Sequence, residues 1–180
     1  MIAAIPPPGP RLEELFALFP TADDVPAYEV VPADAVPPPY HSLLVHPHHM
    51  TVTVEAHHGD LVDVRILARA HRGDSYARKI VLTLRGSGRV VLFGIMHVDL
   101  GACGAEVGEA IVAGQTPLGR ILIEHDVLRR IEPTAFLRID PGPAQLRWFG
   151  LEEPRPLYGR LAYIHCNGRP AVELLEVVTV

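Results

Sequence analysis

Two strand-like segments joined by a glycine-containing turn, at residues 75–98, are the feature that most constrains the fold of this chain. The stretch SYARKIVLTL is followed by RGSG and then by the apolar run RVVLFGIMHV. Glycine readily adopts the positive φ angles that tight hairpin turns require. The segment therefore predicts two long antiparallel strands joined by a tight turn.

Other segments predict further strands with the same kind of connection. The stretches GRLAYIHC and AVELLEVVTV flank an Asn-Gly pair, which predicts a second hairpin near the end of the chain. LVDVRILARA has the alternation of a strand buried on one side. Additional extended segments are expected at TVTVEA (51–56) and at residues 125–139.

Short helices are expected before and between these strands. Helical spacing of apolar residues predicts them at 11–19 and 104–114, and a third is expected to begin with Thr116 as its N-cap and Pro117 as its first residue. Together these segments predict a single α+β domain with about six antiparallel strands and short helices on one face. Proline-rich residues 1–40 are expected to form an N-terminal segment with one short helix, and residues 41–180 the main domain.

Composition excludes several classes of protein. The chain has 180 residues, of which 48% are hydrophobic, so it has enough apolar side chains for a core. Its net charge is −5 and no basic stripe is visible, which argues against a nucleic-acid partner. It begins without a secretory signal and has no apolar run of about 18 residues. We therefore expect a cytoplasmic protein with no membrane partner, and we expect Cys103 and Cys166 to be buried free thiols.

Strand parity places one charge on each of two apolar faces. Arg78 is the only charge on the face of its strand that also carries Tyr76, Ile80, Leu82 and Leu84. Glu176 is the lone charge on a face of valines and a leucine in the last strand. Two interpretations remain open. The pair forms a buried structural salt bridge, or Arg78 grips a small anion in a pocket where Glu176 serves as acid or base.

Several stretches resemble the chorismate pyruvate-lyase family, and they occur in the family's order over about residues 42–180. They are Met50-Thr51, YARKIVL with its strand arginine, TPLGR at 116–120, GRLAYIHCNGRP at 159–170, and the late strand glutamate at position 176. The resemblance implies an antiparallel sheet with helices on one face and an enclosed site. It also implies elimination of pyruvate from chorismate to give 4-hydroxybenzoate, without metal or organic cofactor, in a pathway leading to a quinone such as ubiquinone or to another metabolite.

The resemblance also implies a role for each matching residue. Arg78 would bind the ring carboxylate, assisted by the backbone N–H groups of Met50 and Leu118, and Gly119 would permit close approach of the backbone. Glu176 would act as the acid or base at the other end of the ring. Arg160 would contact the enolpyruvyl carboxylate, although a purely structural role for Arg160 remains open.

Five of the ten histidines fall between positions 46 and 58, which raises the question of a metal site. If TVTVEA is a strand, the two histidine groups lie roughly 20 Å apart, because a strand rises about 3.3 Å per residue. No zinc-binding motif is present. We therefore expect solvated loop histidines and no metal, and leave open whether His48 or His49 reaches the pocket.

Two alternatives to the lyase remain. One is a non-catalytic domain of the same fold that senses small aromatic acids, as in some bacterial transcription regulators. Residues 1–40 do not resemble the winged helix that usually precedes such a sensor. The other is an enzyme of related scaffold acting on a different aromatic or acyl substrate. Presence of both Arg78 and Glu176 favours the lyase, because a sensor needs the anion grip but no acid or base.

Overall fold

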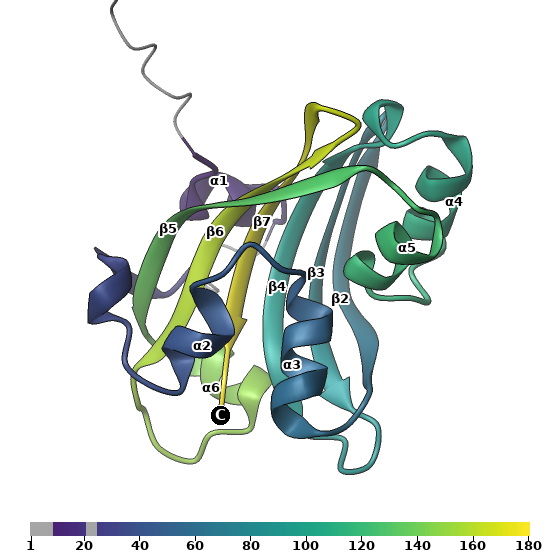
Figure 1. The fold of residues 1–180 in the computed structure, drawn as a ribbon. Helices are drawn as coiled ribbons and strands as arrows, with labels where there is room; N and C mark the ends of the chain where they lie inside the picture. The colour runs from purple at the N-terminus through teal and green to yellow at the C-terminus, as the bar shows by residue number, and fades with distance from the viewer. Residues whose placement is uncertain (1–8, 21–24) are drawn as a thin grey trace, which may run out of the picture.

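A computed structural model describes residues 9–20 and 25–180 of the chain, and it contains one seven-stranded antiparallel sheet. The strand order is β1-β5-β6-β7-β4-β3-β2 (Figure 1). The strands are β1 (Ala27–Val31), β2 (Val62–Arg72), β3 (Ser75–Leu84), β4 (Val90–Asp99), β5 (Arg129–Asp140), β6 (Leu157–Cys166) and β7 (Arg169–Val178). Both predicted hairpins are confirmed, as β3–β4 and β6–β7. In the second hairpin, Asn167 and Gly168 have φ of 52° and 81°, the left-handed values that such a turn requires.

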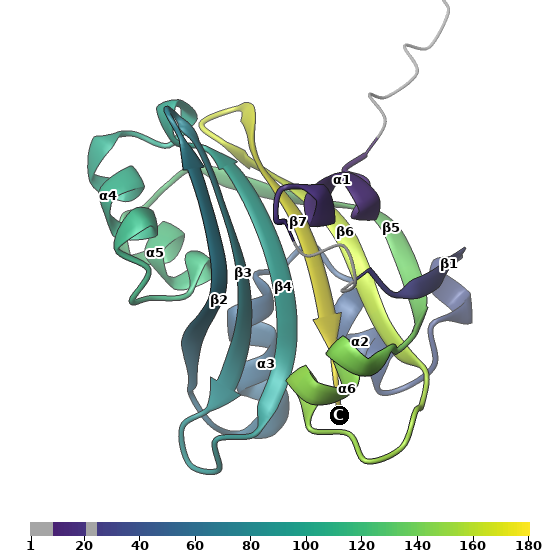
Figure 2. The ribbon, with the colours of Figure 1, turned by 180° about the vertical axis from the view of Figure 1, so that it is seen from behind.

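Helices cover both faces of the sheet, which corrects the expectation of helices on one face. On the face seen in Figure 1 lie α2 (Tyr40–Leu44), α3 (Met50–His58), α4 (Ala105–Ala113) and α5 (Leu118–Glu124). The view from behind in Figure 2 shows α1 (Leu12–Ala17) and α6 (Pro143–Phe149) over the other face. Both faces of the central strands are therefore buried, and the two sides form separate apolar clusters.

The stretch TVTVEA is helical, so the prediction of a strand at 51–56 is wrong. Met50, Thr51 and Val54 are buried on one side of α3, whereas Val52 is exposed. Positions i and i+4 of a helix share one face, so Met50 and Val54 pack together against the sheet. This tertiary burial outweighs the strand preference of β-branched residues, which is worth only tenths of a kcal/mol per residue.

The proline-rich segment takes part in the sheet and its packing. Its predicted helix is confirmed as α1, which contributes Leu12, Leu15 and Phe16 to the core. Residues 27–31 pair with β5 as an edge strand. The N-terminal segment expected at 1–40 includes residues 1–8 and 21–24, which lie outside the described residues.

The second face of β3 carries an unexpected buried cation. Lys79 is 2% exposed, and its Nζ lies 5.2–5.6 Å from the ring centroids of Phe16, Phe19 and Trp148. Aromatic faces attract cations at this range. Alternation within β3 thus places Arg78 and Lys79 on opposite sides of the sheet, each covered by helices.

Candidate functional site

A cavity of about 50 Å³ lies between the sheet and the helices α3 and α5. Its walls are mostly apolar, and its polar groups come from β3, β7 and the first turns of the two helices. The lining residues are His49, Met50, Thr51, Arg78, Ile80, Leu82, Leu92, Gly94, Ile95, Met96, Pro117, Leu118, Gly119, Ile164, Leu174, Leu175 and Glu176. Of the six residues predicted for the site, five therefore line one cavity, and Arg160 does not.

Arg78 is a buried cation whose partners are weak. Arg78 is only 1% exposed. Its guanidinium donates to the carbonyl of Ile111 at 3.4 Å and to that of Thr116 at 3.3 Å. Charge-assisted hydrogen bonds are normally shorter, at about 2.7–2.9 Å. Among the described residues, no carboxylate lies within 4.0 Å of the guanidinium. Burial lowers the pKa of Arg78, although arginine stays protonated.

Two helices begin at the cavity wall, and a glycine allows them to approach closely. A Cβ atom at Gly119 would lie 3.1 Å from both Cβ of His49 and Oγ1 of Thr51, so any larger residue would push α5 away from α3. Helix α5 begins at Leu118, one residue later than predicted, with Pro117 at the N-cap position in place of Thr116. Met50 and Leu118 are the first residues of their helices, where backbone N–H groups lack partners within the helix. Their binding of a carboxylate stays a prediction.

An ion pair that the sequence did not suggest joins these same two helices. Glu55 on α3 and Arg120 on α5 are hydrogen-bonded through Oε1 and a guanidinium nitrogen. The same Oε1 accepts from the backbone N–H of Val62 at 3.0 Å, which ties the pair to the start of β2. Both side chains are largely buried. The pair holds together the two helices that form one wall of the cavity.

Glu176 is paired with Arg160, not with Arg78. The two residues are cross-strand neighbours on β7 and β6, and Nε of Arg160 lies 2.7 Å from Oε2 of Glu176. The buried salt bridge considered from the sequence therefore exists with a different arginine. Glu176 still lines the cavity, but one of its oxygens is already engaged.

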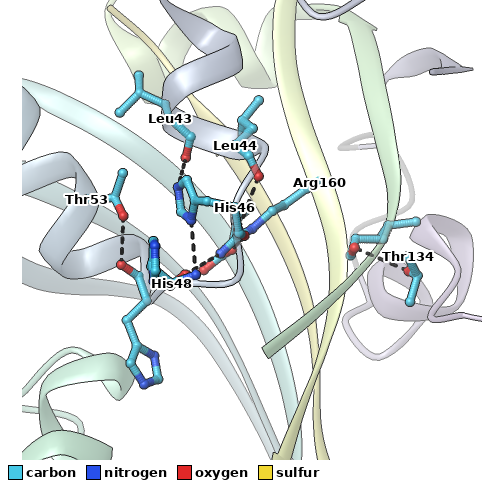
Figure 3. Close-up of polar contacts among 10 residues, drawn as sticks. Leu43, Leu44, His46, His48, Thr53, Thr134 and Arg160 are labelled. Atoms are coloured by element: carbon cyan, nitrogen blue, oxygen red, sulfur yellow. Dashed lines mark hydrogen bonds and ion pairs between the residues drawn. The ribbon is translucent and has the colours of Figure 1, made fainter. Parts of the chain in front are cut away.

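Arg160 acts as a clamp on the loop between α2 and α3. It is 0% exposed, and it donates to the carbonyls of Leu44 at 3.2 Å, His46 at 2.8 Å and His48 at 3.0 Å (Figure 3). With Glu176 included, all three guanidinium nitrogens have acceptors. Four of the five N–H donors of Arg160 are therefore engaged, and its contact with a substrate carboxylate stays a prediction.

The histidines separate into two groups at opposite ends of α3. Among the described residues, no three His, Cys, Asp or Glu side chains converge as a metal site requires. His46 contacts the carbonyl of Leu43 through Nε2 at 2.6 Å, and its Nδ1 accepts from the N–H of His48 at 3.1 Å. These bonds need a neutral ring, and burial lowers the pKa of His46. The histidines near the loop thus support its shape.

His49 is the histidine that reaches the cavity. It is 9% exposed, and its Nε2 accepts from Nε of Arg129 on β5 at 2.6 Å. Burial, reinforced by the nearby charges of Arg129 and Arg160, lowers the pKa of His49 to about 4. The imidazole is therefore neutral near pH 7. No pattern in the sequence distinguishes it from its neighbours His46 and His48.

The lowered pKa of His49 predicts acid sensitivity. The unfolded chain takes up this proton near pH 6.5, whereas the folded chain takes it up only near pH 4. The folded state therefore loses stability as pH falls from 6.5 to 4, by about 3 kcal/mol at 1.36 kcal/mol per pH unit. Urea unfolding at several pH values should show that His49→Gln removes much of this loss. The control His57→Gln, at an exposed position, should leave the loss in place, and an equal effect of both variants would contradict the assignment.

Comparison with solved structures identifies the architecture. The ligand-binding domain of a protein assigned to the GntR family of transcriptional regulators, from Bordetella bronchiseptica, matches with a TM-score of 0.51 and 16% identity. The match covers 66% of this chain and 86% of that domain. The two share a fold. It is the chorismate lyase-like fold that the sequence predicted, here with seven strands.

Other solved structures match with TM-scores below 0.5. The effector domain of PhnF from Mycobacterium smegmatis gives a TM-score of 0.43 at 13% identity, covering 73% of this chain and 87% of that one. Full PhnF gives 0.45 at 12% identity, covering 72% and 63%. No family model and no curated protein matches the sequence. Among the described residues, no helix is long and apolar enough to cross a membrane.

Proposed function

We propose that this chain is a ligand-binding domain that captures a small organic anion with its carboxylate on Arg78. The observation that carries the proposal is a buried guanidinium that faces a cavity and has no carboxylate partner among the described residues. An unpaired buried charge is costly, so a ligand that supplies the missing negative charge gains from this site. Arginine suits this role because its planar fork binds a carboxylate through two hydrogen bonds.

The walls of the cavity favour a compact ligand with an apolar body. Aliphatic side chains surround the space beyond Arg78, supplied by Ile80, Leu82, Leu92, Ile164 and Leu174. Glu176 offers a carboxylate oxygen in the same lining, which suits a hydroxyl or amine donor on the ligand. A small hydroxylated aromatic or branched carboxylic acid carries these groups, and the walls of the cavity of about 50 Å³ must move apart to admit its body. A binding role also agrees with the ligand-binding domain whose fold the chain shares.

Chorismate lyase activity is the second candidate, because the two residues predicted to carry it line the same cavity. In this reaction Arg78 would hold the ring carboxylate while the ether C–O bond breaks, the enolpyruvyl group leaves to become pyruvate, and a ring proton is lost to give 4-hydroxybenzoate. Glu176 would move the proton. Two contacts favour the binding role instead: one oxygen of Glu176 is bound to Arg160, and four of the five N–H donors of Arg160 are already engaged.

Two measurements on the purified protein separate these functions. Isothermal titration with 4-hydroxybenzoate and with the uncharged 4-hydroxybenzyl alcohol should give heat only for the acid, because only the acid neutralises Arg78. Incubation with chorismate should release no pyruvate above the uncatalysed rate in a coupled assay. Sustained pyruvate release would replace the binding role with the lyase. Equal binding of acid and alcohol would contradict the anion site.

A further inference from the structure

A second hollow lies outside the cavity and shares one side chain with it. This outer groove has a volume of about 770 Å³ and runs along the start of α3 and the segment that leads into β5. It is lined by Pro47, His48, His49, Val52, Asp126, Val127, Leu128, Arg129, Arg130 and Ile131. His49 is the residue common to the groove and to the inner cavity. The imidazole therefore lies at the boundary between the outer groove and the cavity beside Arg78.

The backbone around His49 is firmly held. Arg160 binds the carbonyls of Leu44, His46 and His48, which fixes the loop up to the residue before His49 (Figure 3). The carbonyl of His49 itself accepts from the N–H of Thr53 at 3.2 Å and from its hydroxyl at 3.1 Å. Opening of the wall by movement of the whole loop would break all of these bonds. Rotation of one side chain would break far fewer.

The imidazole is held by a single described hydrogen bond, donated by Arg129 at 2.6 Å. Arg129 is half-buried in the groove, and it also donates to the carbonyl of Val127 at 3.0 Å. A carboxylate that enters the groove competes with His49 for the Arg129 N–H, because an anion is the stronger acceptor. Exposed Leu128 and Val52 in the same groove suit an apolar ligand body.

We propose that His49 is the gate through which anionic ligands reach the cavity, and that Arg129 is the latch that a ligand carboxylate releases. This inference rests on the ligand-binding function proposed above and identifies how that site is reached. It assigns Arg129 a role in selecting anions at the groove. It assigns His49 a positioning role, since the imidazole controls access without holding the bound ligand.

Cysteine accessibility tests the gate without knowledge of the natural ligand. Met96 lines the inner cavity and not the groove, so Met96→Cys places a thiol in the cavity. The probes are the anionic reagent sulfonatoethyl methanethiosulfonate and its cationic trimethylammonioethyl analogue. The thiolate attacks the reagent, a mixed disulfide forms and methanesulfinate leaves. Peptide mapping separates this site from buried Cys103 and Cys166.

Adding His49→Ala to Met96→Cys should raise the labelling rate of the thiol by about tenfold or more. The substitution removes the hydrogen bond from Arg129 that holds the imidazole, and a bond to a charged group contributes about that factor. Arg129→Gln should also raise the rate and should remove any preference for the anionic reagent. The matched control is His48→Ala, which lies in the groove but does not line the cavity. It should leave the rate unchanged. Circular dichroism should show that all variants fold like the parent.

Labelling rates that are the same with and without His49→Ala and Arg129→Gln would overturn the gate, as would equal acceleration by His48→Ala. If one of the two gate variants fails to fold, the other still decides the outcome. The result is independent of the titration with 4-hydroxybenzoate. A protein that shows gated labelling but no heat with the acid would retain the access route and lose the proposed ligand class.

Discussion

Replacement of Arg160 by methionine should lower the free energy of unfolding by about 3–5 kcal/mol, the range for breaking a buried ion pair from one side. The substitution leaves Glu176 without its counterion. It also leaves the carbonyls of Leu44, His46 and His48 without their donor in a buried environment. Unsatisfied buried polar groups each cost about 1–3 kcal/mol, although relaxation of the loop recovers part of this.

Urea unfolding of the parent and variant measures this loss directly. The matched control is Arg138→Met on β5, whose contacts with Glu29 at 3.5 Å and Asp140 at 3.2 Å are exposed. Exposed pairs contribute about 0–1 kcal/mol, so the control should be nearly neutral. Addition of Glu176→Leu to Arg160→Met should restore part of the lost stability by removing the orphaned carboxylate. Equal costs for Arg160→Met and Arg138→Met would contradict the clamp.

Replacement of Arg78 by methionine should weaken ligand binding without lowering stability, in contrast to Arg160→Met. Binding of 4-hydroxybenzoate should weaken by about 100-fold or more, because removal of one partner of a buried charge pair costs about 2–5 kcal/mol. The ligand-free variant should be as stable as the parent or more stable, since Arg78 has no carboxylate partner among the described residues and its two carbonyl contacts are long. If Arg78 had only a structural role, the ligand-free Arg78→Met variant would be less stable than the parent.

Calorimetry and thermal melts with and without 4-hydroxybenzoate check both halves of this prediction. The variant should lose the ligand-induced rise in melting temperature that the parent shows. The control is Arg85→Met, just after the same strand. It removes an exposed arginine that pairs with Asp63 at 2.8 Å, and it should retain the ligand-induced rise in melting temperature. Binding by Arg78→Met at parental strength would show that the carboxylate lies elsewhere.

Strand parity in the sequence is sufficient to identify the central residue of the candidate site. Arg78 and Glu176 stand out as single charges on apolar faces, and both line the cavity. Such faces can be read from sequence because side chains alternate strictly along a strand, so burial of one residue predicts burial of its second neighbours. The same reasoning could not foresee that α1 and α6 cover the other face of β3.

The pairing of charges cannot be read in this way. The predicted hairpin makes β6 and β7 neighbours, but the register shift between Ile164 and His165 decides that Arg160 lies opposite Glu176. The loop carbonyls bound by Arg160 lie more than 100 positions away in the sequence. Backbone acceptors carry no sequence signal, so no pattern of residues indicates the clamp.

By itself, the sequence determined the hairpins, the α+β class and the two inward charges, because these follow from local turn chemistry and from the two-residue period of strands. The tertiary structure alone decided that residues 50–58 form a helix, that Glu176 pairs with Arg160, and that His49 lines the cavity. Each of these depends on a contact between distant segments, where burial and hydrogen bonding outweigh the small local preferences that a sequence expresses.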